Sequence, residues 1–189
     1  QGELTPVDAV LACLERIESR FGGRANLALR RVELGDNEIL AADTDVVSPC
    51  ATGAVLDQKS IPRMRAPIVC GAANNQLADP GAHDRLLAER GIVYVPDFLV
   101  NRMGIVNCAD EGAGYVDDDP VFEAHLGDTW ENGVYRLTLD VLERARRNGA
   151  APGAVALEMA ERRSFEEHPI FGHRGRLIIR SVVSSAWAD

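Results

Sequence analysis

Residues 67–76 read PIVCGAANNQ, an apolar run that stops abruptly at small and amide residues. Two other segments have the same form: residues 45–49 (DVVSP), followed by CATGA, and residues 91–96 (GIVYVP), followed by residues 97–104. Short apolar runs separated by helix-compatible segments, such as residues 81–90, are typical of a buried parallel sheet with helical crossovers. Such crossovers are almost always right-handed, so the three strand ends should share one edge, where ligands bind in open α/β sheets.

The segments on either side complete the predicted fold. Before the sheet, we expect an amphipathic helix that begins at Thr5 and Pro6 and ends at Gly22, then a short strand at 26–32 and a loop or short helical turn at 34–42. After the sheet, helical patterns cover residues 105–113, 126–147 and 153–163. The predicted fold class is α/β, a partial Rossmann-like doubly wound parallel sheet with a helical C-terminal segment. The predicted division is a nucleotide-binding domain over residues 1–163 and a C-terminal extension over 164–189.

Charge and hydropathy exclude several classes of partner. The chain has 189 residues, of which 46% are hydrophobic, with 20 basic and 29 acidic residues and a formal net charge of -9. This balance argues against nucleic-acid binding and against docking to an anionic membrane. The sequence contains no apolar run long enough for a transmembrane helix and no secretory leader, so we expect a cytoplasmic protein. Because the chain begins at Gln1, we expect a processed product or part of a longer polypeptide.

The cysteines do not predict a metal site. Cys13, Cys50, Cys70 and Cys108 are widely separated and form no CxxC pair, and the four histidines show no ligand spacing around them. We therefore expect reduced, mostly buried thiols rather than zinc ligands or a disulfide framework.

The strand ends carry the candidate binding residues. In residues 71–76, glycine and alanine allow close approach to the backbone, and Asn74, Asn75 and Gln76 offer uncharged donors and acceptors. That chemistry suits a carboxamide or a ribose; the alternative is a polar turn capped by asparagine. Asn101 follows the third run, where its amide either contacts a ligand or holds the loop.

Together these segments resemble the nucleotide-binding domain of the glutamate/leucine/phenylalanine/valine amino-acid dehydrogenases, and the leucine, valine and phenylalanine branch most of all. Residues 45–76, residues 91–101 (GIVYVPDFLVN) and residues 105–111 (IVNCADE) carry the resemblance, which extends loosely over residues 5–163. It implies an enzyme that oxidatively deaminates an L-amino acid to the 2-oxo acid with NAD as cofactor; NADP is not excluded. It also implies a homo-oligomer.

The resemblance assigns roles to individual positions. Cys50, Ala51 and Thr52 would lie beside the nicotinamide ribose, Ala73 and Asn74 at the nicotinamide end, and Asn101 at the cleft between substrate and nicotinamide. Ile105 and Cys108 would line the pocket for the substrate side chain. The family's Ala-Gly-Gly after the cleft asparagine is replaced by Arg102, Met103 and Gly104.

Other family features do not occur in the sequence. It contains no G-x-G-x-x-G fingerprint, and Lys59 is its single lysine, so the family's catalytic lysine pair and aspartate cannot be assigned. We therefore expect the nucleotide-binding part of a dehydrogenase whose catalytic domain lies N-terminal, in the same or another chain. The alternative is a non-catalytic dehydrogenase-like domain that binds a nucleotide or a protein partner.

Overall fold

A computed structural model describes residues 37–113 and 119–165, together with Ala12, Glu15, Arg16, Ser19 and Gly35. The chain divides into two compact units, residues 1–36 and 37–189. In the first unit, the described residues 12, 15, 16 and 19 are helical and exposed, within the helix predicted over 5–21. The rest of that helix, the strand predicted at 26–32 and nearly all of the extension at 164–189 lie outside the described residues.

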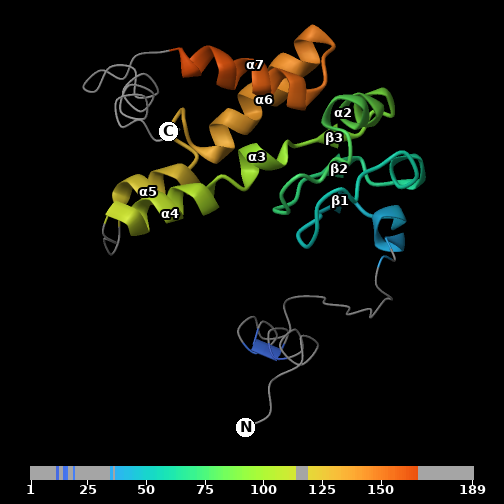
Figure 1. The fold of residues 1–189 in the computed structure, drawn as a ribbon, viewed down its shortest axis with the longest axis horizontal. Helices are drawn as coiled ribbons and strands as arrows, with labels where there is room; N and C mark the ends of the chain where they lie inside the picture. Colours follow the sequence, from blue (N-terminus) through green and yellow to red (C-terminus); the bar gives the residue numbers. More distant parts are fainter. Residues whose placement is uncertain are drawn as a thin grey trace, which may run out of the picture. The chain divides into compact units, whose positions relative to one another are not determined.

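The predicted parallel sheet is confirmed. Strands β1 (Val46–Val47), β2 (Ile68–Val69) and β3 (Val93–Tyr94) pair in the order β1-β2-β3, all parallel (Figure 1). The connection from β1 to β2 contains the short 3-10 helix η2 (Ile61–Arg63), and the connection from β2 to β3 contains helix α2 (Pro80–Glu89). Before β1, the predicted loop or helical turn contains the 3-10 helix η1 (Glu38–Ala41).

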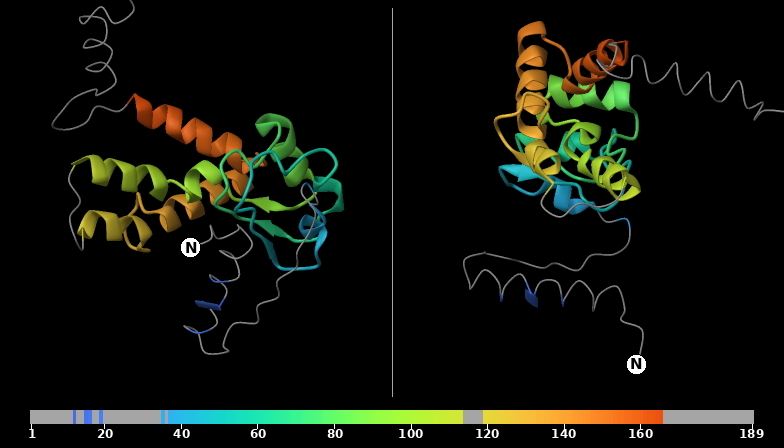
Figure 2. Two further views of the ribbon diagram at one scale, coloured as in Figure 1. Left: turned by 60° about the horizontal axis from the view of Figure 1, so that its bottom comes forward. Right: turned by 90° about the vertical axis from the view of Figure 1, so that its left-hand side faces the viewer.

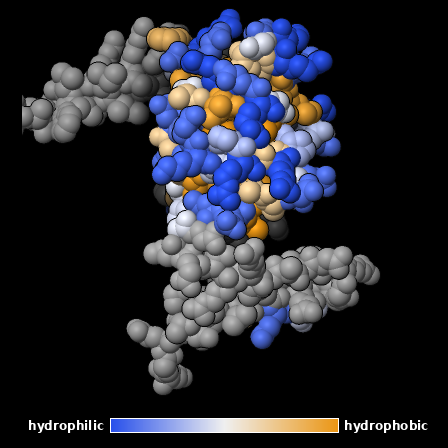
Figure 3. Space-filling model, turned by 90° about the vertical axis from the view of Figure 1, so that its right-hand side faces the viewer, coloured by the Kyte–Doolittle hydropathy of each residue, from blue (hydrophilic) through white to orange (hydrophobic). Residues whose placement is uncertain are grey.

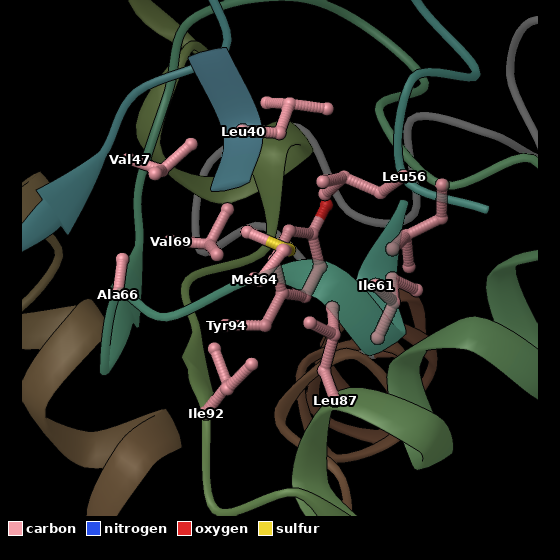
Figure 4. Close-up of a cluster of buried hydrophobic side chains, with 11 residues drawn as sticks. Leu40, Val47, Leu56, Ile61, Met64, Ala66, Val69, Leu87, Ile92 and Tyr94 are labelled. Carbon is pink, nitrogen blue, oxygen red and sulfur yellow. The ribbon is translucent and has the colours of Figure 1, made fainter. Parts of the chain in front are cut away.

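One face of the sheet forms a closed core. Neighbours in register, Val47, Val69 and Tyr94, are buried and pack with Leu87 of α2. Figure 4 shows these side chains converging with those of Leu56, Ile61 and Met64 from the β1–β2 connection. The opposite face carries the row Val46, Ile68 and Val93, whose side chains are 45%, 37% and 41% exposed.

The helices after the sheet differ from the prediction at one place. Helix α3 (Asp97–Val100) is followed by α4 (Met103–Ala113), α5 (Pro120–Leu126), α6 (Val134–Asn148) and α7 (Pro152–Ser164) (Figures 1 and 2). The helix predicted over 126–147 is confirmed by α6 from residue 134 onward, but residues 127–133 form a turn instead. Gly133 begins α6, and a Cβ atom there would lie 3.0 Å from the carbonyl oxygen of Trp130 and 3.1 Å from that of Gly127. The ring of Trp130 packs edge-on against His125, with ring centroids 4.7 Å apart.

Helices α6 and α7 form a second core, which α3 joins. Leu137, Val141 and Ala145 of α6 pack with Val155 and Ala156 of α7 and with Leu99 of α3. Gly149 ends α6 with a φ of 62°, the left-handed conformation that glycine adopts readily. On the face shown in Figure 3, exposed hydrophobic side chains are scattered among hydrophilic ones. In residues 37–113 and 119–165, every helix is too short or too polar to span a membrane.

A buried carboxyl joins α2 to α7. Asp84 of α2 is only 3% exposed, and its Oδ2 accepts a hydrogen bond of 3.2 Å from the backbone N–H of Ala154. Its Oδ1 is buried and has no hydrogen-bond partner within the described residues. Burial raises the pKa of Asp84 above its ordinary value of 3.8, against the opposing effect of the α7 N–H groups.

The raised pKa sets the sign of a pH effect on stability. Because the folded state binds the proton more tightly than the unfolded state, stability falls as the pH rises above the ordinary carboxyl value. We expect Asp84→Asn, which keeps an oxygen acceptor for Ala154, to abolish that loss. Its melting temperature relative to the wild type should rise between about pH 4 and pH 7. Asp84→Ala removes both the titrating group and the acceptor, so it should be less stable than Asp84→Asn by about 1–3 kcal/mol at every pH. A melting-temperature difference for Asp84→Asn that is constant with pH would contradict this assignment.

Candidate functional site

The three strand ends meet at one edge, as predicted. The parallel hydrogen bonding continues just beyond the strands, from the N–H of Cys70 to the carbonyl of Val47 (3.0 Å) and from the N–H of Val95 to that of Val69 (2.9 Å). The segments that follow the three strands therefore all begin at the same edge of the sheet; they are residues 48–54, 70–76 and 95–101.

The first two strand-end loops pack backbone against backbone. A Cβ atom on Gly71 would lie 2.2 Å from the carbonyl oxygen of Pro49, so this position has room only for glycine. The Pro49 carbonyl accepts a 3.0 Å hydrogen bond from the N–H of Ala73, and that of Asn75 accepts one of 2.7 Å from Ala54. Gly53 also lies close to the second loop, since a Cβ atom on it would be 2.7 Å from the Asn74 carbonyl oxygen. The two loops thus form one continuous layer.

Two predicted site residues are in direct contact. The Nδ2 of Asn101, at the end of α3, donates to the Oδ1 of Asn74 at 2.5 Å and to the carbonyl of Ala72 at 3.4 Å. Asn74 is exposed and Asn101 half-buried. Within the described part of the chain, the Nδ2 of Asn74 and the Oδ1 of Asn101 make no other hydrogen bond. We call Asn74 and Asn101 the amide pair; it presents a free donor beside a free acceptor.

Cys50 lies at the first strand end with an exposed thiol, contrary to the expectation of mostly buried thiols. Its Sγ lies 3.2 Å from the Oγ of Ser48 and accepts a weak hydrogen bond from the N–H of Ala72 at 3.5 Å. These bonds, the Ala72 N–H first, lower the pKa of the Cys50 thiol, whereas burial raises the pKa of Cys70. The neighbours Ala51 and Thr52 are exposed, and Ala73 is buried.

The predicted pocket residues lie on α4. Ile105 is 77% exposed, and Cys108 is also exposed. Cys108 is three residues after Ile105, close to one helical turn, which places both on a common side of α4.

Arg102 forms no ion pair with an acid among residues 37–113 and 119–165. Its guanidinium Nη2 contacts the Nδ1 of His125 at 3.0 Å and donates to the carbonyl of Asn132, while its Nε is buried without a hydrogen-bond partner in the described residues. Burial, and then the nearby Arg163, lower the pKa of Arg102. Arg102 therefore fastens the turn between α3 and α4 to the segment between α5 and α6.

Three further residues hold the edge, and the sequence reasoning did not assign these structural roles to them. Gln76 is fully buried, and its Nε2 donates to the carbonyls of Gly71 (2.6 Å) and Ala73 (3.0 Å). The carboxylate of Asp97 accepts from the N–H of Asn75 at 2.6 Å and from the hydroxyl of Tyr94 at 3.0 Å. A signal was present, because a glutamine, an aspartate and a tyrosine directly beside buried strands need internal partners. Among the described residues, no cluster of His, Cys, Asp and Glu could hold a metal ion.

Comparison with known proteins places this geometry in a family. The family model described as glutamate/leucine/phenylalanine/valine dehydrogenase matches residues 8–157. The chain is 40% identical over 162 residues to a valine dehydrogenase of Streptomyces coelicolor, covering 86% of the chain and 40% of that protein. It is 36% identical over 127 residues to a leucine dehydrogenase of Thermoactinomyces intermedius, covering 67% and 32% respectively.

Solved structures agree with the sequence comparisons. An L-tryptophan dehydrogenase from Nostoc punctiforme superposes with a TM-score of 0.59 at 35% identity, over 67% of this chain and 36% of that one. A hetero-hexameric glutamate dehydrogenase from Thermus thermophilus, at 23% identity and a TM-score of 0.52, shows the shared fold. The chain thus spans about two fifths or less of the length of these relatives.

Proposed function

Because this chain belongs to the glutamate/leucine/phenylalanine/valine dehydrogenase family, we propose that it forms the nicotinamide-facing edge of an NAD(P)-dependent L-amino-acid dehydrogenase. The reaction is the oxidative deamination of an L-amino acid to its 2-oxo acid. The rest of the cofactor site and the catalytic lysines come from an N-terminal part, in the same or another chain. We further propose that the enzyme is a cytoplasmic homo-oligomer.

The amide pair is the observation that carries this proposal. The free Nδ2 donor of Asn74 and the free Oδ1 acceptor of Asn101 belong to two hydrogen-bonded side chains at the carboxyl edge of a parallel sheet. A primary carboxamide, such as that of nicotinamide, needs one donor and one acceptor from the protein. The exposed turn at Cys50, Ala51 and Thr52 borders the same layer and suits the adjoining ribose. The residues of this edge therefore fit the nicotinamide half of the cofactor.

When bound, the cofactor supplies the redox chemistry by accepting a hydride from the substrate α-carbon. The residues of this chain bind and orient. Asn74 and Asn101 would hold the carboxamide of the cofactor and so orient it toward the substrate. Ile105 and Cys108 offer an apolar surface to the substrate side chain, which suits the aliphatic and aromatic amino acids that name the related enzymes.

The non-catalytic alternative has one observation in its favour. Lys59, the single lysine, is exposed in a turn where the carboxylate of Asp57 accepts from the backbone N–H groups of Lys59 and Ser60. Lys59 lies in the connection between β1 and β2, which is a different segment from the loops that carry Asn74 and Asn101. Nothing in this chain thus replaces the lysine pair of the family.

We expect the purified chain to bind reduced nicotinamide mononucleotide at the strand-end edge while forming no NADH from NAD and any L-amino acid. The nucleotide carries only the half of the cofactor that these residues fit. Chemical-shift changes in the ¹⁵N–¹H spectrum should gather on residues 50–54, 71–76 and 101. Asn107→Ala on α4, whose Nδ2 binds Glu111, is the control and should leave these changes intact.

Each readout tests one part of the proposal. Shift changes elsewhere, or none at saturating nucleotide, would show that this edge does not receive nicotinamide. NADH formation by the purified chain would show that catalysis does not need a separate lysine-bearing part.

A further inference from the structure

Asp97 is a buried carboxylate that none of the sequence-predicted roles includes. It is the first residue of α3 and only 9% exposed. Both oxygens are engaged, Oδ2 with the N–H of Asn75 at 2.6 Å and Oδ1 with the hydroxyl of Tyr94 at 3.0 Å. Tyr94 is itself 1% exposed at the end of β3, so the carboxylate is anchored to the core of the sheet.

The residue that Asp97 holds has an unusual backbone conformation. Asn75 has a φ of +53°, in the left-handed region that residues other than glycine rarely adopt. Asparagine adopts this region more readily than other non-glycine residues, and here hydrogen bonds on both sides of the residue hold it there. Here its N–H is bound by Asp97 and its carbonyl by the N–H of Ala54. The N–H that Asp97 binds belongs to the peptide group between Asn74 and Asn75.

The C-terminal end of helix α3 also binds this loop. Asn101 follows the last residue of α3 and binds the Oδ1 of Asn74 and the carbonyl of Ala72. The two ends of this single helical turn therefore both bind the loop at residues 72–75. Moving Asp97 would shift the Asn74–Asn75 peptide and, with it, the free amide donor.

We propose that Asp97 is a positioning residue for the nicotinamide edge: through the N–H of Asn75 it sets the orientation of the amide pair. What matters is the place of its acceptor oxygen rather than its negative charge. The inference rests on the proposed function for the identity of the bound group, but not for the geometry of the amide pair.

Two substitutions separate geometry from charge. Asp97→Asn removes the charge but keeps the shape and an Oδ1 that can accept from Asn75. Its Nδ2 then faces the Tyr94 hydroxyl, whose proton loses its acceptor, so this variant should be less stable while keeping the bond to Asn75. Asp97→Glu keeps the charge but moves the oxygens by one methylene. The larger side chain can be accommodated, because Tyr94, Asp97 and Phe98 line a cavity of about 640 Å³ between α2, α3 and the start of α7.

The test uses the ¹⁵N-labelled chain and two measurements. The first is the hydrogen-exchange protection of the Asn75 amide together with the chemical shift of the Asn101 side-chain NH₂, neither of which requires a ligand. The second is the dissociation constant for reduced nicotinamide mononucleotide. We expect Asp97→Glu to lose the Asn75 protection, to shift the Asn101 resonance and to bind about tenfold more weakly. Asp97→Asn should keep both resonances and bind within about threefold of the wild type.

A matched control separates positioning from general stability. Asp79 caps α2 by accepting from the N–H of Ala82 at 2.9 Å, so Asp79→Ala loses an aspartate hydrogen bond on another element. It should lower the melting temperature and leave the Asn101 resonance and the nucleotide affinity unchanged.

Each outcome bears on the proposal. Asp97→Glu with unchanged protection and resonances overturns it, as does Asp97→Asn behaving like Asp97→Glu, which would assign the effect to charge. If the wild type binds no nucleotide, the proposed function fails, and the two ligand-free readouts still decide whether Asp97 sets the amide pair.

Discussion

Gly71→Ala should lower the free energy of unfolding by about 3 kcal/mol, an overpacking effect at the upper end of the usual range. The new Cβ would lie 2.2 Å from the carbonyl oxygen of Pro49 and 2.5 Å from its nitrogen, and both are backbone atoms that no rotamer change can move aside. The first and second strand-end loops would have to separate. Chemical denaturation monitored by circular dichroism measures the difference.

Gly104→Ala is the matched control for this prediction. The same methyl group at Gly104 in α4 meets nothing within 4 Å. Because alanine has a higher helix propensity than glycine, this variant should be equally stable or more stable by about 0.5–1 kcal/mol. Equal effects at the two glycines would refute the close packing of the loops.

The second large effect is on turnover. In a complete dehydrogenase that contains this chain, we expect Asn74→Ala to lower kcat by about 100-fold, because a misoriented nicotinamide places the reactive carbon wrongly. The substitution removes both the free donor and the acceptor that binds Asn101. Steady-state kinetics with a branched-chain amino acid and NAD measure it, and Asn107→Ala should leave kcat unchanged.

The melting temperature of the Asn74→Ala variant distinguishes two roles. A normal kcat with a lowered melting temperature would mean that Asn74 only holds its loop. A lowered kcat with an unchanged melting temperature would mean that the amide orients the cofactor.

The sheet could be predicted from the sequence because its signals are local. A strand covered on both faces in a complete parallel sheet is a short apolar run, and the residues that follow it mark its end, as at Val69, Cys70 and Gly71. The shared edge followed from the parallel pairing that strands joined by helical crossovers adopt. Asn74 and Asn101, which the sequence places at two strand ends, are in contact at that edge, and their role toward the cofactor stays a prediction.

What the sequence could not show depends on contacts between distant residues. Asp97 binds the backbone of a residue 22 positions earlier, and Arg102 binds one 30 positions later. The break before Gly133 was missed because the apolar spacing of Trp130 and Val134 fits a helix, whereas the tight backbone packing of Gly133 becomes visible only in the folded chain. Roles that depend on such contacts need the structure.

The exposed row of Val46, Ile68 and Val93 has a practical consequence for anyone who produces this chain by recombinant expression. Three aliphatic side chains on one face of the sheet are partly exposed, and among the described residues β1 pairs with a neighbour on one side only. If the proposed N-terminal part completes the enzyme, this face and this edge are the surfaces that it would cover. We expect self-association to limit the yield of soluble chain. Co-expression with the complementary N-terminal piece of a related dehydrogenase should improve that yield.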